Sequence, residues 1–226
     1  MINESSLNTH AQECLQKLIS IWFDFEKSLN KVPIIRRLEN GNLSLEDYQH
    51  LLLNLRQQVV EGSRWITRGA SSFDREFSDI RSMVIGHAKE EHRDYEVLEQ
   101  DYVKTGGKLE TIQSQKRNIG SEALHGFLMY RASKPNPIDL IGAMWIIEGL
   151  GQKMADGWSS RIDELLDLDG ATQFMKYHGE NDDAHMQKLY AMLDRVCKNS
   201  EVGKSIQTTA SVVARLYRLQ LEEIDG

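Results

Sequence analysis

Residues 177–185 read YHGENDDAH, and this stretch carries the most specific pattern in the chain. Within it, His178, Asp182 and His185 stand at positions i, i+4 and i+7. At about 100° per residue on an α-helix, the three side chains fall within a stripe roughly 60° wide. Two imidazoles and one carboxylate on one helical face are typical ligands of a divalent transition metal. The pattern therefore predicts a helix that contributes part of a metal site; a solvated polar face is the alternative interpretation.

The remainder of the chain is also patterned for helix. Only three prolines occur among 226 residues, and alternating β-branched runs are few. Ser44 followed by Asp47 is typical of a helix N-terminus, and KPNP at residues 134–137 is the clearest break. Local kinks are expected near Gly157 and Gly179. We expect one all-α domain over residues 1–226, a bundle of about seven to eight helices, with helices near 9–30, 33–40, 45–69, 76–104, 109–133 (one or two), 138–166, 182–198 and 201–223.

The charge balance limits the partners. The chain has 27 Lys and Arg against 34 Asp and Glu, a net charge of −7. Without a basic cluster, nucleic acid and anionic membranes are poor partners. Cys14 and Cys197 form no C-x-x-C pair, and the chain shows neither an 18-residue apolar run nor a basic-then-apolar leader. We expect a reduced, cytoplasmic protein that binds a small molecule.

Two acidic residues on apolar helices could contribute to the metal site. Glu148 interrupts the apolar run AMWIIEGL at residues 143–150. Burial of an unpaired carboxylate is costly, so this group needs a cation, an ion-pair partner or a raised pKa, unless it faces solvent. Glu61 lies on another apolar face. It is either a ligand or neighbour of the metal, or the ion-pair partner of Arg64 or Arg68.

Further candidates lie in HAKEEHRDYE, residues 87–96. His87 and Glu91 share a helical face at i, i+4, and Glu91 and Asp94 share one at i, i+3. His92 lies about 100° from Glu91, so a regular helix does not direct both side chains at one ion. We take Glu91 as the first choice of ligand and His92 as the second, with His87 and Asp94 as alternates.

The order and spacing of these elements resemble the heme-oxygenase-like superfamily, which includes TenA/Thi-4 and pyrroloquinoline-quinone synthase proteins. The likeness is greatest to its branch of diiron oxidases. It lies in a helix with Glu91 and His92 that closes at Gly106-Gly107, a later helix with Glu148, and the motif His178-x3-Asp182-x2-His185. The resemblance implies an iron enzyme, with two irons and O2 as cosubstrate, that oxidises a small amine, amino acid or fatty-acid-like molecule, and a homodimer. The implied metal ligands are Glu91, His92, Glu148, His178, Asp182 and His185.

The chain departs from this branch in the earlier helix. The family usually places a Glu there with a His several residues further along, whereas Glu91 and His92 are adjacent. If Asp94 takes the place of the His, one imidazole is missing. The sequence therefore leaves open whether one, two or no metals bind. It also leaves open which residues complete the site, among Glu61, His87, Glu91, His92 and Asp94.

Other members of the superfamily imply other functions. Thiaminase II of the TenA type uses a nucleophilic Cys in the middle of the chain, and no Cys occurs here between residues 15 and 196. Pyrroloquinoline-quinone synthase works without metal, and its pocket does not explain a His/Asp/His stripe. Haem oxygenase needs a proximal His near the N-terminus, where only His10 is available. A TenA-like hydrolase and a non-catalytic binding protein on the same fold remain the alternatives.

Overall fold

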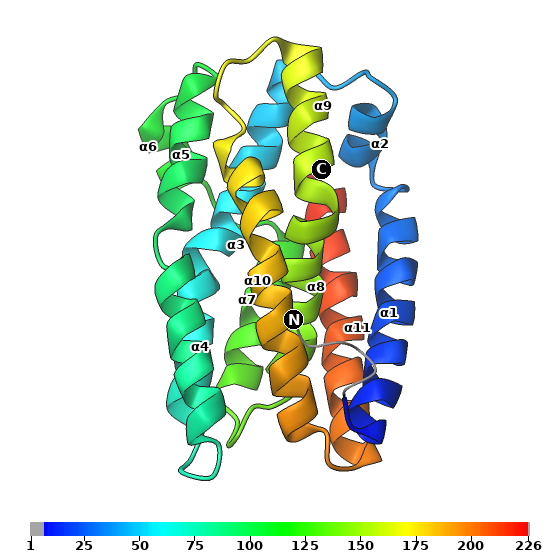
Figure 1. Cartoon of the computed structure of the whole chain (residues 1–226). Helices are drawn as coiled ribbons and strands as arrows, with labels where there is room; N and C mark the ends of the chain where they lie inside the picture. Colours follow the sequence, from blue (N-terminus) through cyan, green and yellow to red (C-terminus); the bar gives the residue numbers. More distant parts are fainter. Residues whose placement is uncertain (1–6, 226) are drawn as a thin grey trace.

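The protein is a bundle of α-helices in a computed structural model (Figure 1). The structure describes residues 7–225, and the side chains of all of these except residues 180–184. No β-strand occurs in the part of the chain described. The predicted all-α fold class is thus confirmed.

The helices follow the order expected from the sequence. The first half of the chain forms α1 (Thr9–Leu29), α2 (Pro33–Glu39), α3 (Leu45–Ser72), α4 (Ser78–Glu91), α5 (Asp94–Lys104) and α6 (Leu109–Ser114). The second half forms α7 (Ile119–Ala132), α8 (Leu140–Leu150), the π-helical turn η2 (Gly151–Ala155), α9 (Asp156–Leu166), α10 (Gln173–Val196), α11 (Ser200–Glu222) and the 3₁₀ turn η3 (Glu223–Asp225).

The long helices pack side by side around one apolar core that runs from Leu7 to Leu221. Helix α11 packs against α1, α7 and α8, and α3 packs against α4, α5 and α7. Helix α10 crosses the front of the bundle in Figure 1, between α4 and α5 on one side and α8 on the other, and it contacts all three. This arrangement places α10, α8 and the α4–α5 pair around a common interior region.

Local sequence signals explain several helix boundaries. The Ser44 hydroxyl accepts a hydrogen bond from the Asp47 backbone N–H, and the Asp47 carboxylate accepts one from the Ser44 backbone N–H. This is the capping box predicted for α3, and it satisfies N–H groups that the first turn of a helix leaves unpaired. Pro33 lies in the first turn of α2, where its missing N–H has no cost.

Two of the expected helices are divided in the structure. The helix expected over 76–104 is interrupted at His92 and Arg93, where Arg93 has φ −125° and ψ 7°. The helix expected over 138–166 continues as α8, η2 and α9, with the irregularity at Gly151–Ala155 rather than at Gly157. Helix α10 continues through Gly179 without a break. A Cβ at Gly179 would lie 3.1 Å from the Asp156 Cβ, so this glycine allows close packing of α10 against α9.

Membrane insertion has no support from the helices that the structure describes. None of them combines the length and the apolar character needed to cross a bilayer.

Candidate metal centre

Helix α10 turns two of its predicted ligands toward the interior of the bundle. The side chains of His178 and His185 are 13% and 8% exposed. Asp182 lies on α10 between them, but its side chain is outside the described residues. The two histidines are separated by seven residues, or about two helical turns, so each can meet a different group on the neighbouring helices.

Glu148 reaches the same region from α8. It is 5% exposed, and Nδ1 of His185 donates a 2.9 Å hydrogen bond to its Oε2. Nε2 of His87, on α4, lies 3.1 Å from its Oε1. Glu148 is thus the buried carboxylate predicted from its apolar run, and it lies between two imidazoles rather than in solvent. The π-helical turn η2 begins three residues later, and such turns are frequent at functional sites.

The interruption between α4 and α5 decides which residues of 87–96 face α10. His87 and Glu91 lie on the last turns of α4, and Asp94 begins α5. All three point inward, with Asp94 Oδ2 3.4 Å from Nε2 of His178. His92 is exposed, and its Nδ1 lies 2.7 Å from the backbone oxygen of Lys89. The structure therefore brings His87 and Asp94, the alternates, to the other candidates and leaves His92 on the outside.

The described side chains form two adjacent groups of possible metal ligands. One group is His87, Glu148 and His185, and the other is Glu91, Asp94 and His178. In each group, one ligand atom per residue lies within 4.8 Å of the others. Oε1 of Glu91 is 3.7 Å from Nδ1 of His185, so Glu91 connects the two groups.

The two groups follow from an antiparallel pairing of similar motifs. His87, Glu91 and Asp94 have the same i, i+4, i+7 spacing as the α10 motif. His87 packs edge-to-face on His185, with ring centroids 4.7 Å apart, while Asp94 lies against His178 at the other end. By this register, backbone positions 91 and 182 lie opposite each other in the middle.

The buried charges shift one another's protonation. Burial, followed by the charge of Glu148, raises the pKa of Glu91 to about 7. Burial also acts to raise the pKa of Glu148, but the hydrogen bond from His185 and the adjacent imidazole of His87 outweigh it and hold that pKa well below its usual range. Burial acts to lower the pKa of His87, yet the adjacent carboxylate of Glu148 reverses this, so the net pKa is raised. Protons and a cation would compete for these groups.

The residues present fit a divalent metal. Glu91 Oε1 and Asp94 Oδ2 are buried and accept no hydrogen bond from any residue that the structure describes. A buried carboxylate oxygen without a partner is costly, and a cation removes that cost. Nε2 of His87 and Oε1 of Glu148 are close without hydrogen-bond geometry. Mixed imidazole and carboxylate donors of this kind suit iron, manganese or zinc better than calcium or magnesium.

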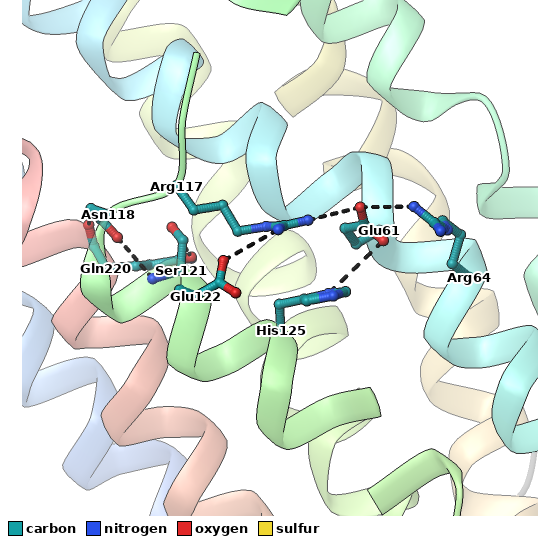
Figure 2. A network of polar contacts seen from close by, with 8 residues as sticks. All are labelled: Glu61, Arg64, Arg117, Asn118, Ser121, Glu122, His125 and Gln220. Carbon is teal, nitrogen blue, oxygen red and sulfur yellow. Dashed lines mark hydrogen bonds and ion pairs between the residues drawn. The ribbon is translucent and has the colours of Figure 1, made fainter. Parts of the chain in front are cut away.

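Glu61 belongs to a different cluster. Figure 2 shows its carboxylate between Arg117 and Arg64, at 2.8 and 3.1 Å, with His125 Nδ1 3.9 Å away. Of the two alternatives left by the sequence, the ion pair with Arg64 is the one present, and Arg117 is a further partner. Arg117 comes from the segment before α7, so no helical spacing connects it with Glu61.

A cavity of about 100 Å³ adjoins the two groups. Glu91, Glu148 and His178 form part of its wall. The remaining wall comes from α3, α8, η2, α9, the start of α10 and Tyr217 of α11, and it is mainly apolar and aromatic. The sequence did not predict this wall, because its residues come from six separate elements.

The fold is found in solved structures. A domain of unknown function with a heme oxygenase-like fold from Shewanella denitrificans OS217 is 20% identical, with a TM-score of 0.85 over 94% of this chain and 90% of that chain. A TenA homologue from Pseudomonas syringae pv. tomato str. DC3000 is 14% identical, with a TM-score of 0.79 over 99% and 96%. A TenA homologue from P. horikoshii OT3 is 15% identical, with a TM-score of 0.73 over 93% and 97%. No protein-family model and no curated protein matches the chain. At these identities the likeness shows the fold: the chain has the heme-oxygenase-like fold that TenA homologues share.

Proposed function

We propose that the protein is a non-haem iron oxidase that holds two irons and uses O2 to oxidise a small molecule. The observation that carries this proposal is the pair of adjacent ligand groups, one with two imidazoles and one carboxylate and the other with one imidazole and two carboxylates. Glu91 lies between the two groups and would help to hold the metal there. The ligands would come from facing helices, as in other helical bundles that hold two metals.

Each described residue has a role in this proposal. His87, Glu148 and His185 hold one metal; Glu91, Asp94 and His178 hold the other. The iron, when bound, supplies the redox chemistry with O2. The carboxylates offset its positive charge, and the bundle excludes bulk water from one side of the site. Burial raises the pKa of Glu91 to about 7 in the metal-free protein, so near neutral pH this group would release a proton when metal binds.

Iron loading under anaerobic conditions tests the proposal. The protein is incubated with Fe(II), freed of excess metal and analysed for iron, and O2 is then added while absorbance and O2 consumption are followed. Retention of close to two irons per chain, with O2-dependent absorbance, is expected. Retention of no iron in wild-type protein whose fold is intact overturns it.

A second candidate function is a metal-independent hydrolase of the TenA kind. The favouring observation is that two of the fold neighbours described above are TenA homologues. Against it, Cys14 and Cys197 are both buried and neither lines the cavity. Hydrolysis of thiamin or an aminopyrimidine in the presence of EDTA would favour this candidate. If neither activity occurs but a small molecule binds, a non-catalytic binding protein is the remaining proposal.

The homodimer implied by the family resemblance is also retained as a proposal. Light scattering coupled to size-exclusion chromatography tests it. A mass of about 52 kDa, twice the 25.9 kDa of the chain, is expected, and a mass near 26 kDa at micromolar concentration contradicts it.

A further inference from the structure

The cavity beside the candidate metal centre has a distinct chemical character. Four large aromatic side chains contribute to its wall: Trp65, Trp158, Phe174 and Tyr217. Its acidic and imidazole side chains are Glu91, Glu148 and His178, all of them candidate metal ligands. Neither Lys nor Arg occurs among the described residues that line it. An anionic ligand group would therefore find no counter-charge in the cavity, and a cationic group would find only carboxylates that a bound metal would already occupy.

The nearest other carboxylate on α3 is that of Glu61, and it does not change the charge of the cavity wall. Glu61 is 8% exposed and is neutralised by Arg117 and Arg64 in the cluster of Figure 2. It is not among the residues that line the cavity. Gln58 is a polar residue that lines the cavity. Its Oε1 accepts a 2.8 Å hydrogen bond from Nε2 of Gln220. Glu61 and Oε1 of Gln58 are thus already paired with protein partners, whereas Nε1 of Trp158, which also lines the cavity, is buried without a hydrogen-bond partner among the described residues.

Gly62 determines how far the cavity extends toward α3. It lies in the middle of this helix and lines the cavity. A Cβ at Gly62 would have nothing within 4 Å among the residues that the structure describes. The Cβ of a side chain at this position would therefore lie in open space at the α3 side of the cavity.

We infer that the cavity binds an uncharged, apolar body of a ligand against the candidate metal centre, and that Gly62 sets the size of the body it accepts. That this ligand is the substrate rests on the proposed function. The inference selects, among the substrate classes considered above, molecules with a hydrocarbon or aromatic part over free amino acids and small polar amines. An apolar group gains free energy by leaving water. An anion placed there loses its hydration without compensation, and so does a cation once metal neutralises the carboxylates of Glu91 and Glu148.

Three probes of similar size and different charge test the inference. Benzyl alcohol is neutral, benzoate is an anion, and benzylammonium is a cation at pH 7. Binding is measured by calorimetry and by quenching of tryptophan fluorescence, since Trp65 and Trp158 line the wall. The protein is used both in EDTA and loaded with Co(II). In EDTA, we expect benzyl alcohol to bind at least tenfold more tightly than benzoate, and with Co(II) bound at least tenfold more tightly than benzylammonium. Equal or tighter binding of benzoate in EDTA, or of benzylammonium with Co(II) bound, overturns the inference.

Two glycine variants locate the bound probe. Gly62→Leu is expected to weaken benzyl alcohol binding at least tenfold, and Gly62→Ala is expected to weaken it less. Gly126→Leu is the matched control, because Gly126 is also a helical glycine without neighbours within 4 Å, is exposed on α7 and does not line the cavity. Its affinity should equal that of the wild type. Unchanged affinity in both Gly62 variants, with melting temperatures near that of the wild type, places the probe elsewhere and overturns the inference.

The metal-free measurement separates this inference from the proposed function. Failure to retain iron removes the oxidase but leaves the affinities in EDTA unaffected. Conversely, a protein that retains iron but does not discriminate among the probes keeps the proposed function and loses the inference about its ligand. The Co(II)-loaded measurement then shows whether bound metal alters the affinity of benzoate, the probe that can itself ligate a metal.

Discussion

Nδ1 of His185 donates a 2.9 Å hydrogen bond to Oε2 of Glu148, and this contact joins α10 to α8 in the interior of the bundle. Without metal, the contact satisfies a carboxylate that would otherwise be buried alone. With metal, both groups become candidate ligands, and the proton between them must leave. Folding and metal binding therefore use the same pair of side chains.

Replacement of Glu148 by glutamine should remove metal binding. Glutamine keeps the size of the side chain but not the charge, so His87 and His185 lose their shared anion. We expect affinity for Co(II) or Fe(II) to fall by at least about tenfold, as measured by calorimetry and metal analysis. Glu99→Gln is the matched control, because Glu99 is also a buried glutamate but is paired with Arg56 away from the site. Equal metal content in the two variants would contradict the assignment.

Measurements of metal content and affinity also show which of His87 and His92 is a metal ligand. His87 is buried beside Glu148, whereas His92 is exposed and contacts the backbone of its own helix. His87→Ala should lower the metal content and the affinity by at least about tenfold. His92→Ala should change neither. The opposite result, loss of metal in His92→Ala alone, would mean that the α4–α5 segment rearranges when metal binds.

The sequence alone did not determine which of these two histidines faces the metal centre. Glu148 and His185 were predictable because an acid in an apolar run and an imidazole at helical spacing are local signals. His87 points inward because α4 packs against α10. His92 points outward because the helix breaks there, and no residue near the break predicts it. One signal could have helped: His87, Glu91 and Asp94 repeat the spacing of the α10 motif.

Contacts between distant segments were not predictable either. The buried thiols of Cys14 and Cys197 lie close enough in the core to shift each other's pKa, although they stand at opposite ends of the sequence. The same holds for the cavity wall and for Arg117 beside Glu61. Helical periodicity shows which face of each helix is apolar, but it does not show which helices meet or in what register.

The stability of the metal-free protein should decrease as the pH rises from about 5 to 8. The pKa of Glu91 is raised to about 7 from 4.5, and the pKa of His87 is raised above 6.5. For both groups, the folded state binds protons more tightly than the unfolded state, so their contribution is present at low pH and is lost as each folded-state pKa is passed. Thermal unfolding in EDTA should show a lower melting temperature at pH 8 than at pH 5.5.

Divalent metal should reverse this dependence, because ligands bind metal in their deprotonated forms. In excess Co(II), stabilisation by metal should increase from pH 5.5 to 8. Glu91→Gln should flatten the pH dependence of the metal-free protein, while Glu122→Gln, a change at an exposed glutamate on α7, should leave it unaltered. A melting temperature of the metal-free wild type that rises steadily with pH would contradict the raised pKa values.

Close packing of α8 on α11 should be required to position Glu148. Gly142 lies on α8 six residues before Glu148, and a Cβ there would overlap the backbone oxygen of Ile206 and lie 2.9 Å from the Ala210 nitrogen. Backbone atoms cannot move aside as a side chain can, so Gly142→Ala must separate the helices. We expect a loss of about 1–3 kcal/mol in the free energy of unfolding, together with weaker metal binding.

Gly157→Ala is the matched control for this change. Gly157 lies on α9, is exposed, and a Cβ there would have no neighbour within 4 Å among the described residues. Alanine loses less backbone entropy than glycine when a helix forms, so this variant should gain about 0.5–1 kcal/mol and keep wild-type metal affinity. Urea unfolding of the metal-free proteins measures both changes, and calorimetry with Co(II) measures binding. If Gly142→Ala is as stable as the wild type, α8 and α11 do not pack at this distance. The position of Glu148 would then have to be set by its contacts with α4 and α10 instead.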